Sequence, residues 1–105
     1  MEQSSYEVRF YVGTVPKDHG PTRSVLLVPQ AEALLARTYG GSTQYVTNGS
    51  WIAPDGATIR ETSYVWEVIA EDLNSVRTVA AQLREIFNQE CVLVTAKPLS
   101  LSEFI

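Results

Sequence analysis

The sequence predicts an α+β fold in which two helices pack on one face of a four-stranded antiparallel sheet. Four segments alternate apolar and polar residues with the period of a strand, and two others repeat apolar residues at helical spacing. The chain has 105 residues, of which 45% are hydrophobic and 19% charged, a composition typical of globular proteins. We therefore expect a single α+β domain over residues 1–105.

The chain should begin with a strand, a long loop and a helix. Residues Tyr6 to Val12 alternate between an apolar and a mostly polar face, which predicts a strand with one buried side. The segment from Gly13 to Arg23 is rich in Gly, Pro and polar residues, and connections of this length are often functional. Pro29 suits the first turn of a helix and Gly40 a position just beyond its end, so a helix is expected between them.

A hairpin is expected after this helix. Ser42 to Ile52 has the pattern of a strand, within which Asn48-Gly49 could place a turn or a bulge. Pro54-Asp55-Gly56 is a strong turn signal. Thr58 to Ile69 is dense in β-branched and aromatic residues and is predicted as the returning strand.

The remaining elements are a second helix and a last strand. Asp72 is a suitable N-cap for a helix that runs to about Asn88, with its apolar residues in one stripe. Glu90 to Lys97 is expected to be the fourth strand, ended by Pro98. The order strand, helix, strand, strand, helix, strand is that of the ferredoxin-like βαββαβ sandwich.

Both helices cover one face of such a sheet, which leaves the other face to solvent or to a second subunit. Its mixture of charged and apolar side chains suits an interface with paired charges, so we predict a homodimer. The residues expected on this face are Glu7, Arg9, Tyr11, Glu61, Ser63, Val65 and Glu67.

The composition argues against several kinds of partner and location. The formal net charge is -4 and the basic residues are scattered, so no nucleic-acid partner is expected. Apolar runs such as Val25 to Pro29 are too short to span a bilayer, and the first residues lack the pattern of a signal peptide, so no membrane partner is expected. The single Cys91 cannot form a disulfide within the chain, which favours a reducing compartment and a cytoplasmic location.

The sequence contains no motif for a catalytic nucleophile, a phosphate-binding loop or a metal centre, so no cofactor and no metal are expected. The only histidine, His19, follows Asp18 in the long loop. A carboxylate beside it would suit a general base, and a solvated loop histidine is the alternative. In the catalytic interpretation, Arg23 or Tyr11 would stabilise an anion.

Three further side chains have both a functional and a structural interpretation. Trp51, near the predicted turn, could stack on a planar ligand or simply pack. Glu61 could hold a proton if it is buried, although an ion pair with Arg9 or Arg60 is favoured. Cys91 is expected to be a buried structural thiol. The candidate ligand-binding residues are therefore Tyr11, His19, Arg23, Trp51, Glu61 and Ser63.

A set of spaced residues runs through the last two-thirds of the chain. They are Gly41-Ser42-Thr43, Gly49-Ser50-Trp51, Gly56, Glu61-Thr62-Ser63, the run Phe87-Asn88-Gln89-Glu90-Cys91-Val92-Leu93, and Phe104. In this spacing the chain resembles an uncharacterised family of small bacterial proteins, a domain of unknown function. The resemblance implies a fold and no activity, and the segment from Gly13 to Arg23 departs from the family pattern.

If this motif marks a site, the resemblance implies that its residues are Trp51, Glu61, Ser63, Gln89 and Glu90. The structural alternative is that Gly49 and Gly56 shape the hairpin, while Gln89-Glu90 orders the turn into the last strand.

Two functions remain open from the sequence. The first is a non-catalytic binding protein for a small molecule or a protein partner, such as a bacterial or phage accessory or inhibitory factor. The second is a cofactor-free enzyme of the dimeric α+β barrel type, an isomerase or monooxygenase-like protein with His19 as its base. The shortage of catalytic motifs favours the binding protein.

Overall fold

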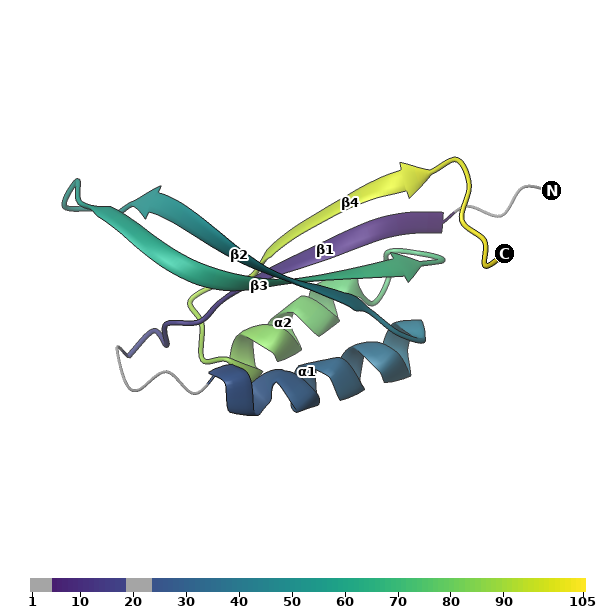
Figure 1. The fold of residues 1–105 in the computed structure, drawn as a ribbon, viewed down its shortest axis with the longest axis horizontal. Coiled ribbons are helices and arrows are strands. Elements are labelled where there is room, and N and C mark those ends of the chain that lie inside the picture. The colour runs from purple at the N-terminus through teal and green to yellow at the C-terminus, as the bar shows by residue number, and fades with distance from the viewer. Residues whose placement is uncertain (1–4, 19–23) are drawn as a thin grey trace.

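The computed structural model describes residues 5–18 and 24–105, which form four strands and two helices in the predicted order. The four strands make one antiparallel sheet in the order β2-β3-β1-β4, and both helices lie against the same face of it (Figure 1). The predicted ferredoxin-like α+β fold is confirmed. The elements are β1 (Ser5–Gly13), α1 (Ser24–Tyr39), β2 (Thr43–Ile52), β3 (Thr58–Ala70), α2 (Val76–Ile86) and β4 (Leu93–Leu99).

The core lies between the sheet and the two helices. The alternation of β1 directs Val8, Phe10 and Val12 towards the helices, and all three are fully buried. Phe10 pairs across the sheet with Trp66 of β3, which is also fully buried. Burial of each of these side chains stabilises the fold by about 1.5–3 kcal/mol. The helices contribute a matching stripe of Ala31, Leu34, Leu35, Val76, Val79 and Leu83.

Helix α1 begins at Ser24, so the predicted start at Pro29 was wrong. Pro29 lies inside the helix, where it lacks the N–H that would bond to the carbonyl of Val25. Val25 is 72% exposed, so water can solvate that carbonyl and the helix continues. The predicted end was right, because Gly40 follows the last helical residue with a φ of 87°.

Two other predicted boundaries were wrong for local reasons. Helix α2 begins after Ser75, because the carboxylate of Asp72 accepts a hydrogen bond from the N–H of Asn74 at 2.9 Å and forms a turn instead of a cap. Strand β4 runs through Pro98 to Leu99. Pro98 is tolerated there because β4 is an edge strand that pairs only with β1.

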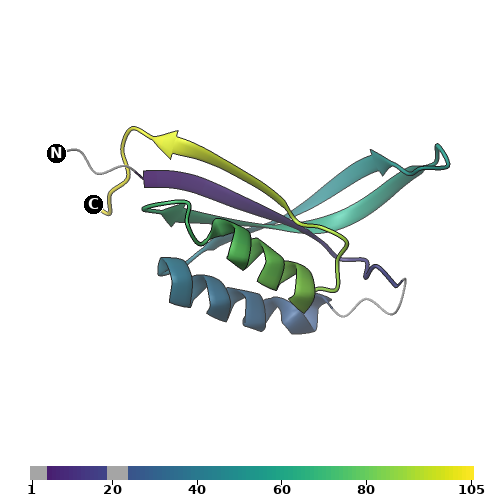
Figure 2. The ribbon, with the colours of Figure 1, turned by 180° about the vertical axis from the view of Figure 1, so that it is seen from behind.

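The β2–β3 hairpin projects beyond the rest of the sheet. Strand β3 has 13 residues and β1 has nine, and the last pair between them joins Gly13 to Ser63. Residues 48–62 therefore form a two-stranded extension, here called the arm, which has no helix beneath it (Figures 1 and 2). Its pairing runs without a bulge through Asn48 and Gly49, and every residue of β2 is exposed.

Trp66 is predicted to carry a large share of the stability. Trp66→Ala should lower the free energy of unfolding by about 3–5 kcal/mol because it leaves a cavity in a packed core. Trp66→Phe should cost much less, since the buried Nε1 of Trp66 has no hydrogen-bond partner to lose. Urea unfolding would measure both, with Trp51→Ala on the exposed arm as the control. Equal losses for the two Trp66 variants would contradict this account.

Candidate functional site

The open face of the sheet carries four of the six predicted site residues, three of them near the end of β1. Tyr11 pairs with Val65, and Glu61 and Ser63 share that face of β3 by the two-residue period. Trp51 pairs with Ile59 and so lies on the same face, further out on the arm. The other two predicted residues, His19 and Arg23, lie outside the described residues.

The carboxylate of Glu61 rests against the backbone of Gly13. Its Oε1 occupies the space that a β-carbon at residue 13 would need, so only glycine allows this approach. The N–H of Thr14 donates a hydrogen bond to the same carboxylate. The hydroxyl of Thr14 also donates to the carbonyl of Thr62 at 2.7 Å, which ties the chain after β1 to the base of the arm.

The loop after α2 brings a second oxygen to this point. Gln89 is buried, and its Nε2 donates to the carbonyl oxygens of Val15 at 2.8 Å and Phe87 at 3.1 Å. Its Oε1 lies 2.7 Å from the position that a β-carbon of Gly13 would take. The oxygens of Glu61 and Gln89 therefore flank one small region, which can accept a hydrogen-bond donor or a cation.

The expected ion pair of Glu61 with Arg9 or Arg60 was wrong. Arg9 instead contacts Glu67 at 3.0 Å and Glu7 at 3.2 Å, and Glu61 forms no ion pair with any described residue. Lys97 also pairs with Glu7, at 3.6 Å. Arg9, Glu67, Glu7 and Lys97 thus form a network of ion pairs on the open face that leaves Glu61 out.

Partial burial raises the pKa of Glu61, and the hydrogen bond from Thr14 opposes this with a smaller effect. Side chains with a perturbed pKa are concentrated at functional sites, which makes Glu61 a candidate site residue.

Other residues of the motif lie in more open positions. Trp51 is half-exposed, so its ring is free to stack on a ligand. Glu90 is exposed, and Cys91 is exposed as well, so the expectation of a buried thiol was wrong. The sequence did not predict that Gly13 and Thr14 contact the Glu61 carboxylate, because a glycine at the end of a strand usually marks only the start of a loop.

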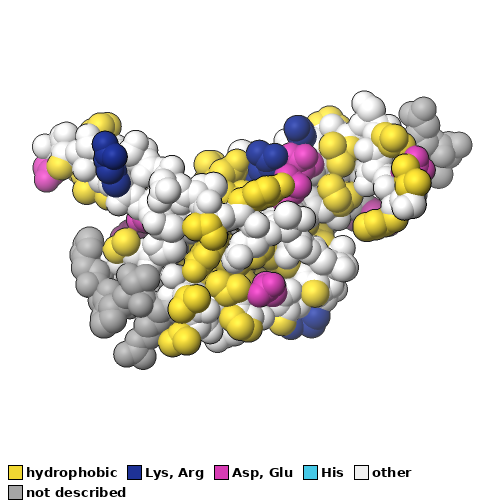
Figure 3. All heavy atoms as spheres, viewed as in Figure 1, with side chains coloured by type: hydrophobic (Ala, Val, Ile, Leu, Met, Phe, Trp, Pro, Cys, Tyr) yellow, Lys and Arg dark blue, Asp and Glu magenta, His cyan; other side chains and the backbone are white. Residues whose placement is uncertain are grey.

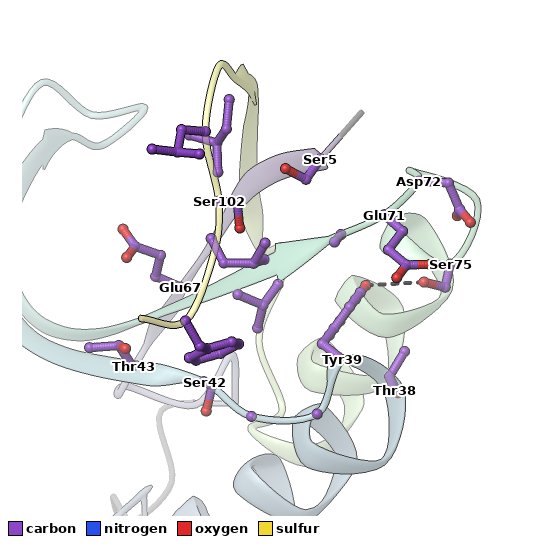
Figure 4. A pocket seen from close by; sticks show the side chains of 18 of the residues that line it. Ser5, Thr38, Tyr39, Ser42, Thr43, Glu67, Glu71, Asp72, Ser75 and Ser102 are labelled. Atoms are coloured by element: carbon purple, nitrogen blue, oxygen red, sulfur yellow. Dashed lines mark hydrogen bonds between the residues drawn. The ribbon is translucent and has the colours of Figure 1, made fainter. Parts of the chain in front are cut away.

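A cavity of about 1050 Å³ lies at the opposite end of the sheet. It lies between the end of α1, the end of β3 and the chain after β4, and none of the predicted site residues lines it (Figure 4). Hydroxyl and carboxylate groups line its walls, and the hydroxyl of Ser75 donates to that of Tyr39 at 3.2 Å. Its lining includes no Lys, Arg or His, so it is an acidic cavity.

Two features are absent from the described residues. No group of three or more His, Cys, Asp and Glu side chains there is placed to hold a metal ion. Neither helix in the described part of the chain has the length and apolar character needed to cross a membrane.

Comparisons with known proteins identify similar folds. No family model matches the chain, and no curated protein does either. A phage SAM lyase in complex with S-methyl-5'-thioadenosine superposes with a TM-score of 0.71 and 20% identity, covering 89% of this chain and 80% of that chain. The apo form of a phage SAM lyase gives 0.68 and 23% identity over 93% of this chain and 83% of that chain. CutA from Synechococcus elongatus gives 0.62 and 11% identity over 91% and 77%. At these identities the likeness concerns the fold.

Adding one methyl group at residue 13 tests the contact between Gly13 and the Glu61 carboxylate. Gly13→Ala should push the flexible carboxylate of Glu61 into solvent and so lower its pKa towards the ordinary value. An NMR titration of the Glu61 carboxyl group would measure the shift. Gly49→Ala is the matched control, because Gly49 pairs with Glu61 and a β-carbon there meets no atom within 4 Å. An unchanged titration of Glu61 in Gly13→Ala would refute the contact.

Glu61 should cost stability at neutral pH. Its raised pKa means that the folded state binds the proton more tightly than the unfolded state, so its contribution to stability falls as pH rises through the window between the two pKa values. Glu61→Gln should therefore be at least as stable as the wild type near pH 7, and the wild type should gain on the variant as pH is lowered. Urea unfolding at several pH values would measure the difference in free energy of unfolding between the two proteins. A wild type that becomes less stable relative to Glu61→Gln as the pH is lowered would disprove the prediction.

Proposed function

We propose that the protein binds S-adenosylmethionine at the base of the arm and acts on it as a lyase. The observation that carries this proposal is the pair of oxygens from Glu61 and Gln89 beside Gly13, which no described cation neutralises. S-Adenosylmethionine brings two cationic groups, its sulfonium and its α-ammonium. The similarity in fold to a phage SAM lyase bound to S-methyl-5'-thioadenosine supports this class of substrate.

The open face offers a binding group for each end of such a substrate. The Glu61 carboxylate and the Gln89 carbonyl can accept hydrogen bonds from an ammonium group. Trp51 lies two positions beyond the residue that pairs with Glu61, roughly 7 Å further along the strand. Stacking of adenine on its ring would contribute about 1–3 kcal/mol. Ser63, opposite Gly13, and Tyr11 add hydroxyl groups on the same face.

The lyase step needs no cofactor and no water. The bond between the sulfonium sulfur and the aminobutyrate side chain breaks, and its electron pair neutralises the sulfur to give the thioether S-methyl-5'-thioadenosine. The carbon that loses sulfur forms a bond to the substrate's own carboxylate oxygen, which closes a lactone. Because the positive and negative charges cancel in this step, a site that excludes water favours it. Glu61 would hold the ammonium group and so leave the substrate carboxylate free to attack.

Two earlier hypotheses relate to this proposal. A non-catalytic binding protein would use the same cluster and differ only in leaving the ligand intact. An enzyme with His19 as general base gains no support from the described residues, and the lyase step requires no base. The proposed location in the cytoplasm agrees with this substrate, which is made inside cells.

The purified protein is expected to convert S-adenosylmethionine to S-methyl-5'-thioadenosine, detectable by liquid chromatography. Glu61→Gln should lower kcat/KM by roughly 10²-fold, since it removes the charge that holds the ammonium group. Glu32→Gln, on the exposed side of α1, is the matched control and should leave the rate unchanged. Calorimetric binding without product would favour the non-catalytic binding protein, and absence of both would refute the proposed ligand.

A further inference from the structure

The side-chain amide of Gln89 is fixed in one orientation. Its Nε2 donates to the carbonyl oxygens of Val15 at 2.8 Å and Phe87 at 3.1 Å, which uses both of its hydrogens. Gln89 is only 8% exposed, so turning the amide over would leave two carbonyl groups without their donor. Its Oε1 is therefore held on the side of Gly13, where the Glu61 carboxyl group also lies.

Two oxygens thus face one small space, and one of them belongs to a titratable group. The amide oxygen of Gln89 only accepts hydrogen bonds, and so does the carboxylate of Glu61 while it is ionised. One donor hydrogen between them satisfies both oxygens. It comes either from Glu61 itself, when the carboxyl group is protonated, or from an N–H of a bound cation. A protonated Glu61 has lost the charge that attracts a cation, so the two states exclude each other.

The basic side chains on the open face of the sheet are paired with other carboxylates. Arg9 lies 3.0 Å from Glu67 and 3.2 Å from Glu7, and Lys97 lies 3.6 Å from Glu7. Figure 3 shows basic and acidic side chains side by side over the middle of the sheet, apart from the arm. These cations are therefore engaged away from Glu61.

The elements packed around Glu61 carry few other charged or titratable groups. Arg60, its neighbour in β3, points to the opposite face of the strand. Strand β2, in which Gly49 pairs with Glu61, has no charged residue. The groups in the two adjoining loops are all exposed, and they are Lys17, Asp18, Glu90 and Cys91. Burial, which raises the pKa of Glu61, and the N–H of Thr14, which lowers it, therefore govern its titration.

We propose that a proton and the ammonium group of the ligand compete for the place between the Glu61 carboxyl group and the Gln89 amide oxygen. Binding then requires an ionised Glu61 and releases a proton wherever Glu61 was protonated. The part that concerns the ligand rests on the proposed function. Because a sulfonium has no hydrogen on sulfur to donate, this place takes the α-ammonium of S-adenosylmethionine.

The competition gives binding a defined dependence on pH. Above the pKa of Glu61 in the free protein, the Kd should not change with pH. Below this pKa the Kd should rise about tenfold for each unit that the pH falls, because one proton must leave for each ligand bound. Glu61→Gln imitates the protonated state, so its affinity should be low and independent of pH. His19→Gln should keep the pH dependence of the wild type, and its loss there would overturn the proposal.

Calorimetry with S-adenosylhomocysteine tests this dependence. This probe has the same ammonium and carboxylate groups, but its thioether is neutral and does not undergo the proposed cleavage. The Kd would be measured from about pH 4.5 to pH 7, where an α-amino group stays protonated. At the pKa of Glu61, buffers of different ionisation enthalpy should show release of roughly half a proton per ligand. S-Methyl-5'-thioadenosine, which has no ammonium group, is the matched control. A Kd of S-adenosylhomocysteine that does not change with pH, or an equal change for both compounds, overturns the proposal.

A titration of the free protein separates this proposal from the proposed function. Gln89→Met and Gln89→Glu both lose the hydrogen bonds to Val15 and Phe87, and they differ in the group beside Glu61. Met removes the acceptor and should lower the pKa of Glu61, whereas a second carboxylate should raise it, so that the two values differ by roughly 1 or more. NMR would measure both, and shifts in the same direction overturn the shared proton. Opposite shifts without binding of S-adenosylmethionine or S-adenosylhomocysteine would refute only the proposed ligand.

Discussion

The difference in length between β1 and β3 is the constraint on which the functional side of this protein depends. Strand β1 ends at Gly13, which pairs with Ser63, whereas β3 begins five residues earlier, at Thr58. The first residues of β3 therefore have no neighbouring strand on the β1 side. The chain after β1 turns into this space, and the carboxylate of Glu61 meets Gly13 there. A longer β1 would have paired with the first residues of β3 and covered Glu61 with backbone.

The packed core places the second half of the site. Tyr64, Trp66 and Phe87 form a cluster with ring centroids 5.3 to 6.2 Å apart, which fixes the end of α2 beneath β3. Gln89 follows Phe87 by two residues and is held by hydrogen bonds to Phe87 and Val15. Asn88 adopts a φ of 51° between them, a conformation that asparagine tolerates better than most residues. The aromatic cluster and these hydrogen bonds therefore hold the side-chain oxygen of Gln89 beside Gly13.

The sequence predicted the fold well because the periods of its strands and helices are regular and the order of elements allows few topologies. The ends of the elements are harder to predict. Pro29 and Pro98 have the pattern of boundaries but lie inside α1 and β4, because the freed carbonyl of Val25 is open to water in one case and β4 is an edge strand in the other. Tyr11, Trp51, Glu61 and Ser63 were predicted to matter, and period-two counting places three of them on one face. The meeting of Glu61 with Gly13 and Gln89 depends on loop geometry that brings together residues 48 and 28 positions apart, which no local pattern encodes.

The unbroken register of the arm also bears on how its length can change during evolution. Since the strands pair residue by residue from Thr43 to Ile52, loss or gain of two residues in each strand would alter the reach by about 7 Å and keep every side chain on its face. A change of one residue would turn Trp51 to the side of the helices. In related chains, each strand of the hairpin should therefore differ in length by an even number of residues. The reach of the arm can then change while the residues at its base keep their arrangement.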